Sequence, residues 1–328
     1  MTAVALQRSG LVTFGESMGR IAADQIGLLD FSRTCTISVG GAESNVAIAA
    51  ARLGADVTWA GRLGRDSVGD LIERRLRTEG VQRQITRDDS FTGLMVCSRR
   101  TNAGVRVDYH RAGSAGSRLT PDDVGEDLIR QAAVLHVTGI TPALSDTARA
   151  TTLWAVRTAQ AAGVRVSVDV NYRSKLWRPD EAAPVLRELA THADTVFAGP
   201  DEAALVLGID EAYAAVETRK PMALAHAMTT LGARSAIVKD GPRGCAAVID
   251  NQPYVQAAVP VDTVDPVGAG DAFVAGYLVE LLAGSDARTR LATATRAGAY
   301  AVTVPGDCEG LPFRHEIDTF TAAEDVAR

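Results

Sequence analysis

The chain has 328 residues, of which 46% are hydrophobic and 23% are charged, a composition typical of a globular protein with a large core. Its net charge of −6 argues against a nucleic-acid-binding protein, and it contains no run of apolar residues long enough to span a membrane. Four scattered cysteines without a C-x-x-C pair indicate free thiols in a reducing cytoplasm, not a disulfide framework or a zinc site.

The N-terminal part of the chain predicts short strands and helices in alternation. It shows no basic segment followed by an apolar run, so we expect no signal peptide. The predicted elements, in chain order, are a strand at 11–14, one or two short strands at 19–39, a helix at 43–53, a strand at 57–60 and a helix at 67–79. Alternating residues at 91–98 and 104–111 then predict a hairpin whose turn lies at 101–104.

From residue 118 onward, strand and helix patterns follow each other regularly. The strands are expected at 134–137, 164–170, 195–198 and 235–239, and the helices at 145–162, 180–191, 200–207 and 221–231. A hairpin at 244–258 and two helices at about 269–283 and 286–301 complete the chain. Such alternation predicts an α/β fold with a mostly parallel sheet covered by helices on both faces.

Residues 262–273 give the clearest functional signal. Val259 and Val261 predict a strand before this segment, and Phe273 begins a helical pattern after it. Gly268-Ala269-Gly270 would then lie at a helix N-terminus, where free N–H groups and the helix dipole attract an anion. Asp271 follows at once, as expected of a base beside a phosphoryl group. On these four residues alone, a plain tight turn is the favoured interpretation.

Polar residues follow several of the predicted strands. They are Asn171, Arg173, Gly199, Glu202, Lys239 and Gly241. Because ligands of parallel sheets bind at the carboxyl ends of the strands, this set predicts a shared site, although each residue singly is explained as a helix cap or loop residue. Tyr109 and Arg111 share one face of the hairpin, where they offer either a carboxylate-binding fork or an exposed strand face.

Two segments resemble the signatures of one enzyme family. Gly40-Gly41-Ala42-Glu43-Ser44-Asn45-Val46-Ala47, with 52–54 and 61–69, resembles the N-terminal signature of the ribokinase-like (PfkB) carbohydrate kinases, and residues 262–273 resemble the C-terminal one. The resemblance implies a three-layer α/β/α sandwich with a mostly parallel central sheet and a small β-sheet lid. It implies one domain over 1–328, with lid segments at about 19–39 and 91–111.

Within that family, residues 109–115 and 169–177 resemble the substrate segments of 2-keto-3-deoxygluconate kinases. This resemblance implies ATP-dependent phosphorylation of the terminal hydroxyl of a keto-deoxy sugar acid. Two arginines suited to one carboxylate support an acid, because a neutral sugar such as fructose or ribose would leave both without a partner. An exposed edge of the lid sheet also predicts a homodimer or a higher homo-oligomer.

The resemblance also implies roles for individual residues. Asp271 would be the catalytic base, and the N–H groups of Gly268, Ala269 and Gly270 would hold the transferred phosphoryl group. The sugar acid would be bound by Gly40, Gly41, Asn45, Tyr109, Arg111, Asn171 and Arg173. The nucleotide would be bound by Lys239, Gly241 and Gly244, Mg²⁺ by Glu202, and a monovalent cation such as K⁺ by the carbonyl of Asp265.

The sequence departs from the family pattern at two positions. Gly199 replaces the Asn of the family's Asn-x-x-Glu segment near magnesium, although Glu202 is kept. Thr295-Arg296 stands where the family has an Asn near the adenine. These changes put the metal contacts and the nucleotide preference in doubt.

Other functions compete with the kinase. A kinase of a neutral sugar and a non-catalytic sugar-acid sensor would use the same fold. Gly15-Glu16-Ser17-Met18-Gly19 matches the nucleophile elbow of serine hydrolases, but the residues after it do not predict the required helix. Gly268-x-Gly270 could begin a dinucleotide fingerprint, but Phe273 replaces its third glycine.

Overall fold

The computed structural model describes residues 10–101, 104–209 and 220–320. Residues 102 and 103 of the predicted hairpin turn lie outside these ranges, as do residues 1–9 of the stretch in which no signal peptide is expected. The described strands form a nine-stranded sheet and a four-stranded sheet.

The nine-stranded central sheet is mostly parallel, as the alternation of strands and helices predicts. In spatial order its strands are β13 (Gln252–Gln256), β12 (Cys245–Ile249), β11 (Ser235–Lys239), β10 (Thr195–Ala198), β9 (Arg165–Asp169), β8 (Val134–Thr138), β1 (Leu11–Phe14), β4 (Val57–Gly64) and β5 (Gln82–Asp88). Neighbours from β11 to β5 pair in parallel, and the β12–β13 hairpin pairs antiparallel at one edge. The carboxyl ends of the parallel strands therefore lie along one rim of the sheet.

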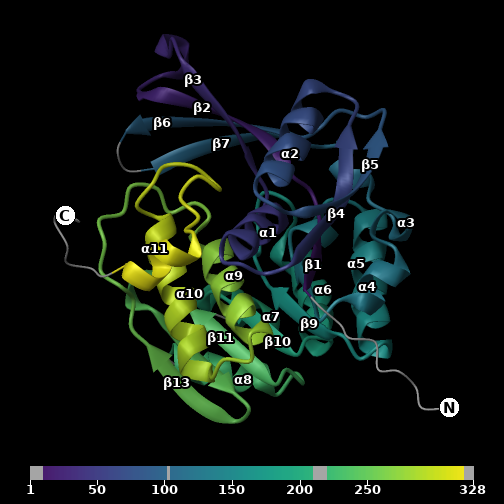
Figure 1. Cartoon of the computed structure of the whole chain (residues 1–328), viewed down its shortest axis with the longest axis vertical. Coiled ribbons are helices and arrows are strands. Elements are labelled where there is room, and N and C mark those ends of the chain that lie inside the picture. Colours follow the sequence, from purple (N-terminus) through teal and green to yellow (C-terminus); the bar gives the residue numbers. More distant parts are fainter. Residues whose placement is uncertain (1–9, 102–103, 210–219, 321–328) are drawn as a thin grey trace.

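Helices cover both faces of this sheet, which gives the three layers (Figure 1). One face packs against α1 (Ala42–Arg52), α2 (Ser67–Thr78), α9 (Ala269–Leu282), α10 (Ala287–Ala301) and α11 (Arg314–Thr319). The other face packs against α3 (Pro121–Val124), α4 (Glu126–Gln131), α5 (Asp146–Ala161), α6 (Pro179–Thr191), α7 (Pro200–Leu207) and α8 (Pro221–Thr229). None of the helices in the described ranges has the length and apolar composition of a membrane span.

Helix α9, which begins at the predicted anion loop, is buried almost throughout because it lies between the central sheet and two other helices. Its apolar side chains surround it on all sides, as expected of a helix inside a core. Phe197 of β10 packs edge-on against Tyr277 of α9 with ring centroids 5.2 Å apart. Gly276 lets α10 approach, since a Cβ there would lie 3.0 Å from the Cα of Ala294. This packing fixes where the helix N-terminus points.

The smaller sheet projects beyond α1 and α2 at the top of Figure 1. Its strands, in spatial order, are β3 (Cys35–Gly40), β2 (Met18–Ile26), β6 (Leu94–Thr101) and β7 (Gly104–His110). The outer pairs are antiparallel and the central pair, β2 with β6, is parallel. Both segments expected to form the lid, at about 19–39 and 91–111, lie in this sheet.

Several sequence predictions of elements are wrong or incomplete. Among the described residues 257–268 none is in a strand, so the strand predicted at Val259 and Val261 is absent; Pro260 between them has no N–H for a sheet ladder. Strand β5 was not predicted, because its sequence is largely polar and half-exposed at the sheet edge. The short helices α3, α4 and α11 also give too little periodicity to be predicted.

Candidate active site

The predicted anion loop lies at the start of α9, as expected. Gly268 has a φ of +79°, a conformation that favours glycine, and its Cα faces the main-chain carbonyl of Asp307 so closely that a Cβ would collide with it. The N–H groups of Gly268, Ala269 and Gly270 donate to no main-chain carbonyl of the described residues. Three donors at the positive end of a helix therefore point away from the protein's own acceptors.

Asp271 lies in the first turn of this helix and is 9% exposed. Burial is the main cause that raises its pKa to about 7, the amide of Asn45 opposes this shift by donating a 2.8 Å hydrogen bond to Oδ2, and the charge of Asp169 adds to it. The positive charges of Arg173 and Lys239 also lower it. A carboxyl group that titrates near neutral pH can both accept and return a proton, which general base catalysis requires.

Three charged side chains from different strand ends gather next to the loop. Lys239, at the end of β11, contacts both carboxylate oxygens of Asp169 at 2.8 Å, and Asp169 ends the neighbouring strand β9. Burial alone would lower the pKa of Lys239, but the charges of Asp169 and Glu202 raise it. A Cβ on Gly270 would lie 3.5 Å from the Lys239 ammonium. The loop therefore has a fixed cation beside its amides.

Glu202, in the first turn of α7, faces the same group of charges. Its carboxylate accepts hydrogen bonds from the N–H of Gly199 at 2.6 Å and of Tyr172 at 2.9 Å. Burial and the charge of Asp169 raise the pKa of Glu202. In the described part of the chain, no three His, Cys, Asp or Glu side chains are arranged to hold a metal ion. Mg²⁺ is typically bound by one or two protein carboxylates together with phosphate and water oxygens. Glu202 has a carboxylate suited to this role.

A hollow of about 450 Å³ opens beside Lys239. Its lining residues are Pro200, Asp201, Lys239, Asp240, Gly241 and Arg243. Two of the three residues predicted to bind the nucleotide thus line one concave surface. Gly244 is not among the lining residues: its carbonyl accepts the N–H of Asp240 at 2.7 Å and its φ is +93°, so it shapes the turn between β11 and β12. Nucleotide binding by Gly244 stays a prediction.

The residues predicted to bind the sugar come from the small sheet, α1 and the loop after β9. Gly40 ends β3 and packs directly against the carboxylate of Asp307, so closely that no side chain would fit. Gly41 precedes α1, which carries Asn45 one turn further on. Asn171 is 5% exposed with a φ of +40°, and it begins the loop that also carries Arg173.

Tyr109 connects these groups. Burial raises the pKa of its hydroxyl, whereas the charges of Arg111 and Arg173 lower it, so both guanidinium groups act on one phenol. The guanidinium of Arg111 lies over the Tyr109 ring, 5.6 Å from its centroid. Lys175 donates a 2.8 Å hydrogen bond to the carbonyl of Val107, which ties the loop after β9 to strand β7. The small sheet and the central sheet therefore meet at the predicted sugar site.

The structure corrects one premise of the substrate prediction. Arg111 is not without a partner, because its Nη2 lies 2.5 Å from Oε2 of Glu16 and its Nε lies 2.7 Å from the same oxygen. Arg173 is exposed and donates to the neighbouring carbonyl of Tyr172 at 3.2 Å. Of these two arginines, only Arg173 has no carboxylate partner among the described residues, as was expected of both.

The carboxylate of Asp265 is fully buried, with Arg99 at 3.1 Å and Arg20 at 3.9 Å. A cation near Asp265 would therefore meet its main-chain carbonyl, as the sequence predicts, and not its carboxylate.

Asp169, Asp307 and Glu16 were not among the predicted site residues. Asp169 stands at a strand end, and that position is the signal that could have identified it. Burial raises the pKa of Asp307 to about 6, although Arg20 lies 3.6 Å away. Neither Asp307 nor Glu16 belongs to a pattern that sequence alone reveals, since each acts on segments far away in the chain.

Two competing interpretations have no support in the geometry. Ser17 is buried, accepts a hydrogen bond from Ser44 at 3.1 Å, and is followed by strand β2 instead of the helix that a nucleophile elbow needs. Phe273, in the place of the third glycine of a dinucleotide fingerprint, is a buried core residue that packs edge-on against Phe197. The anion loop also follows the last strand of the sheet, not the first.

Comparison with known proteins agrees with these features. Residues 9–314 match the family model described as "pfkB family carbohydrate kinase". A 2-dehydro-3-deoxygluconokinase of Bacillus subtilis is 35% identical over 319 residues, which cover 95% of this chain and 95% of that protein. A 2-dehydro-3-deoxygalactonokinase of Haloferax volcanii is 34% identical over 299 residues, which cover 90% of this chain and 92% of the relative.

The fold also agrees with a solved structure. A candidate ribokinase II from E. coli, crystallised in complex with ATP and Mg²⁺, superposes with a TM-score of 0.84 at 25% identity. The match covers 95% of this chain and 98% of that one. The predicted ribokinase-like α/β fold, with a large mostly parallel sheet and a separate small sheet, is thereby confirmed.

Proposed function

This chain belongs to the pfkB family of carbohydrate kinases, and we propose that it uses ATP to phosphorylate the terminal hydroxyl of a keto-deoxy sugar acid, first of all 2-keto-3-deoxygluconate. The observation that carries the proposal is the start of α9, where a buried carboxyl group with a pKa of about 7 directly follows three free N–H groups. Phosphoryl transfer needs little more from a protein than such alignment and charge stabilisation.

Each of these residues has a distinct role in the proposed reaction. Asp271 takes the proton of the acceptor hydroxyl as that oxygen attacks the γ-phosphorus of ATP, and the bond from this phosphorus to the β,γ-bridging oxygen breaks, so that ADP leaves. The amides of Gly268, Ala269 and Gly270 hold the charge on the transferred phosphoryl group, and one such donor is worth about 3–4 kcal/mol in a transition state. Lys239, beside Gly270, adds a fixed positive charge on the nucleotide side.

We propose ATP and Mg²⁺ as the nucleotide and the metal. The hollow that Lys239 and Gly241 line beside the anion loop offers room for a nucleotide. Glu202 would hold the metal, directly or through water, because its oxygens lie at the strand ends next to Asp169 and Lys239. When bound, Mg²⁺ would supply positive charge that offsets the charge of the phosphate groups.

The substrate class follows from the sugar side of the site. The two relatives above are named as kinases of 2-dehydro-3-deoxy sugar acids, and 2-dehydro and 2-keto denote the same group. Arg173, exposed beside Asp271 and Tyr109, has no carboxylate partner among the described residues and suits the carboxylate of such an acid. Arg111 would contribute its remaining edge, with Tyr109 and Asn171 assisting, and Gly40, Gly41 and Asn45 would contact the hydroxyls. The small sheet would act as a lid that keeps water from the reaction.

An ADP-release assay over a panel of sugars tests this proposal. We expect turnover of 2-keto-3-deoxygluconate and 2-keto-3-deoxygalactonate, with kcat/KM for fructose and ribose at least about 10²-fold lower, as for the loss of charged hydrogen bonds. Equal kcat/KM for fructose and the sugar acids would reject the acid and favour a neutral-sugar kinase. Absence of ADP release with every sugar, at undiminished sugar binding, would indicate a sensor.

We further propose a monovalent cation, K⁺, at the carbonyl of Asp265. Asp265 is buried and lies three residues before Gly268 of the anion loop, so a cation bound at its carbonyl would order both segments. Assays in K⁺ and in tetramethylammonium at equal ionic strength test this proposal, and equal rates in both would reject it.

We also propose a homodimer or a higher homo-oligomer. Ile26, Phe31 and Ile37 of the small sheet and its connecting loop are 57%, 69% and 66% exposed, which is unusual for large apolar side chains. Light scattering after gel filtration would test the oligomeric state, and a monomer mass at micromolar concentration would reject it. The four free thiols agree with a cytoplasmic location, which cell fractionation would test.

A further inference from the structure

Glu16 lies in the first of four connections that join the central sheet to the small sheet, and it touches all of them. The connections are 15–17 between β1 and β2, residue 41 between β3 and α1, 89–93 between β5 and β6, and 111–115 between β7 and the 3-10 helix Gly116–Arg118. A Cβ on Gly41 would lie 2.5 Å from the Glu16 carbonyl oxygen, and one on Gly93 would lie 2.8 Å from Glu16 Oε1. Gly116, the residue directly after the fourth connection, packs against the Glu16 side chain.

The Glu16 carboxylate binds the fourth connection directly. Arg111 gives two nitrogens to Oε2, at 2.5 and 2.7 Å, and the hydroxyl of Ser114 donates to Oε1. The side chain of Glu16 is 1% exposed and that of Arg111 is 10% exposed, so water screens this ion pair little. Two glycines, Gly93 and Gly116, leave the space that the carboxylate fills.

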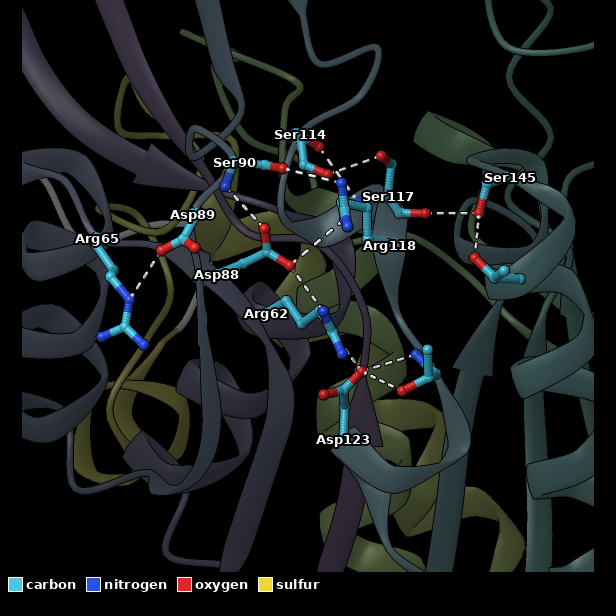
Figure 2. A network of polar contacts seen from close by, with 12 residues as sticks. Arg62, Arg65, Asp88, Asp89, Ser90, Ser114, Ser117, Arg118, Asp123 and Ser145 are labelled. Carbon is cyan, nitrogen blue, oxygen red and sulfur yellow. Dashed lines mark hydrogen bonds and ion pairs between the residues drawn. The ribbon is translucent and has the colours of Figure 1, made fainter.

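The third and fourth connections are in turn fastened to the central sheet. Figure 2 shows Arg62 of β4 between Asp88 and Asp123, with ion pairs of 2.7 and 2.6 Å. Arg118, at the end of the 3-10 helix that follows the fourth connection, contacts Asp88 and also Ser90 of the third connection (Figure 2). Glu16 therefore lies between the central sheet, to which these ion pairs fix the connections, and the projecting small sheet.

This geometry leaves one edge of Arg111 available. With Nε and Nη2 on Glu16, the remaining nitrogen, Nη1, donates to no carboxylate or carbonyl of the described residues. Its guanidinium lies over the ring of Tyr109, which is also predicted to bind the sugar. A guanidinium already fixed by a buried partner loses less side-chain entropy when it binds a ligand.

We propose that Glu16 is a positioning residue for substrate binding, which fixes Arg111 for the substrate carboxylate and ties that arginine to the connections of the small sheet. The inference rests on the proposed sugar-acid kinase function and names the element through which the acid is recognised. Glu16 itself does not touch the substrate. If the Glu16–Arg111 ion pair had only a structural role, it would stabilise the fold equally well. Its removal would then not change how the enzyme discriminates between substrates.

A double-mutant cycle of Glu16→Gln and Arg111→Gln separates these two roles. We expect Glu16→Gln to raise KM for the sugar acid at least about 10-fold, with kcat within about 3-fold, because a charged hydrogen-bond partner is lost on the binding side only. In the Arg111→Gln background, the same change should raise KM less than about 2-fold further, because its effect passes through Arg111. KM for fructose should change by less than about 2-fold.

Glu188→Gln is the matched control, since it removes one carboxylate from an exposed ion pair with Arg157 (2.6 Å) far from the site, and should leave both KM values unchanged. Additive effects in the cycle, or equal changes of KM for the acid and for fructose, would overturn the inference. If Glu16→Gln does not fold by circular dichroism, Glu16→Asp takes its place, because the shorter side chain cannot keep both contacts, and the same outcomes decide. The wild-type sugar panel reports separately on the proposed function: acid preference with an additive cycle rejects only the role of Glu16.

Discussion

The side-chain amide of Asn45 donates a 2.8 Å hydrogen bond to the carboxylate of Asp271, although the two residues are 226 positions apart. Asn45 lies on α1 and Asp271 lies on α9, and the two helices pack side by side on the central sheet. This bond joins the two sequence segments that resemble the family signatures. It also lowers the pKa of the proposed base, which burial raises.

Asp271→Asn should abolish most turnover while leaving binding intact. The amide has the same shape but cannot accept a proton, so we expect kcat to fall at least about 10²-fold with KM within a few-fold. ADP release gives kcat and isothermal titration gives binding. Asp286→Asn, which keeps a good helix cap at the start of α10, is the control. An active Asp271→Asn enzyme would remove Asp271 from the mechanism.

Asn45→Ala should shift the acid limb of the pH profile. The proposed base works ionised, so kcat should rise as the pH increases through its pKa of about 7. The Asn45 amide lowers that pKa by bonding the carboxylate, so its removal should raise the pKa and move the limb to higher pH. The pH dependence of kcat measures this shift. A limb that stays in place or moves to lower pH would contradict the prediction.

Asp169→Asn should have the opposite effect on the same limb and should also destabilise the fold. The charge of Asp169 raises the pKa of Asp271, so neutralising it should move the limb to lower pH. It also leaves the Lys239 ammonium without the carboxylate that it contacts at 2.8 Å, which should cost about 3 kcal/mol of unfolding free energy. Urea denaturation measures the loss.

The control for this loss is Asp250→Asn, which breaks an ion pair with Arg234 whose two side chains are 60% and 74% exposed. It should cost less than about 0.5 kcal/mol, since water screens such pairs. Equal losses for the two variants would show that the Lys239–Asp169 pair adds no more than a surface contact does.

The unfolding free energy of Glu43→Gln should increase relative to that of the wild type as the pH rises. Glu43 is fully buried, and burial raises its pKa, although Thr138 and Thr141 each donate a 2.6 Å hydrogen bond that opposes the shift. A raised pKa in the folded state means that the stability owed to Glu43 is complete below the unfolded pKa of about 4.3 and is lost as the pH rises through the folded value. Glutamine does not titrate and so keeps its contribution.

Unfolding free energies of the wild type and Glu43→Gln, measured in urea from pH 4 to pH 8, check this. The difference between the two proteins should change in favour of the variant with rising pH, because other titrating groups cancel. A constant difference would mean that Glu43 has the same pKa in the folded and unfolded states.

Much of this site could be predicted from short-range patterns. The glycines and Asp271 at the start of α9 lie in one segment, and Asn171, Glu202 and Lys239 follow predicted strands, so local sequence and the rule for parallel sheets identify them. The alternation of apolar strands and amphipathic helices likewise predicts the layers of the fold. In these cases the physical cause is local, or depends only on the order of the elements.

What could not be predicted depends on contacts between distant segments. Glu16 and Arg111 are 95 residues apart, and nothing in either segment reveals that the first neutralises the second. Asp307 meets Gly40 only because the loop after α10 folds over the start of α9. Strand β5 forms on a polar sequence because β4 offers it a free edge, which is a tertiary effect that overrides local preference.

The burial of α9 between α1, α10 and the central sheet has a consequence for biosynthesis. Every parallel strand of that sheet leaves the ribosome before α9 does, so a nascent chain can assemble most of the scaffold while lacking the amides and the carboxylate that would act on phosphate. An incomplete polypeptide would therefore lack the residues proposed to act on the nucleotide. Catalytic competence would arise in one late step, when α9 enters the groove that α1 and the sheet have already formed.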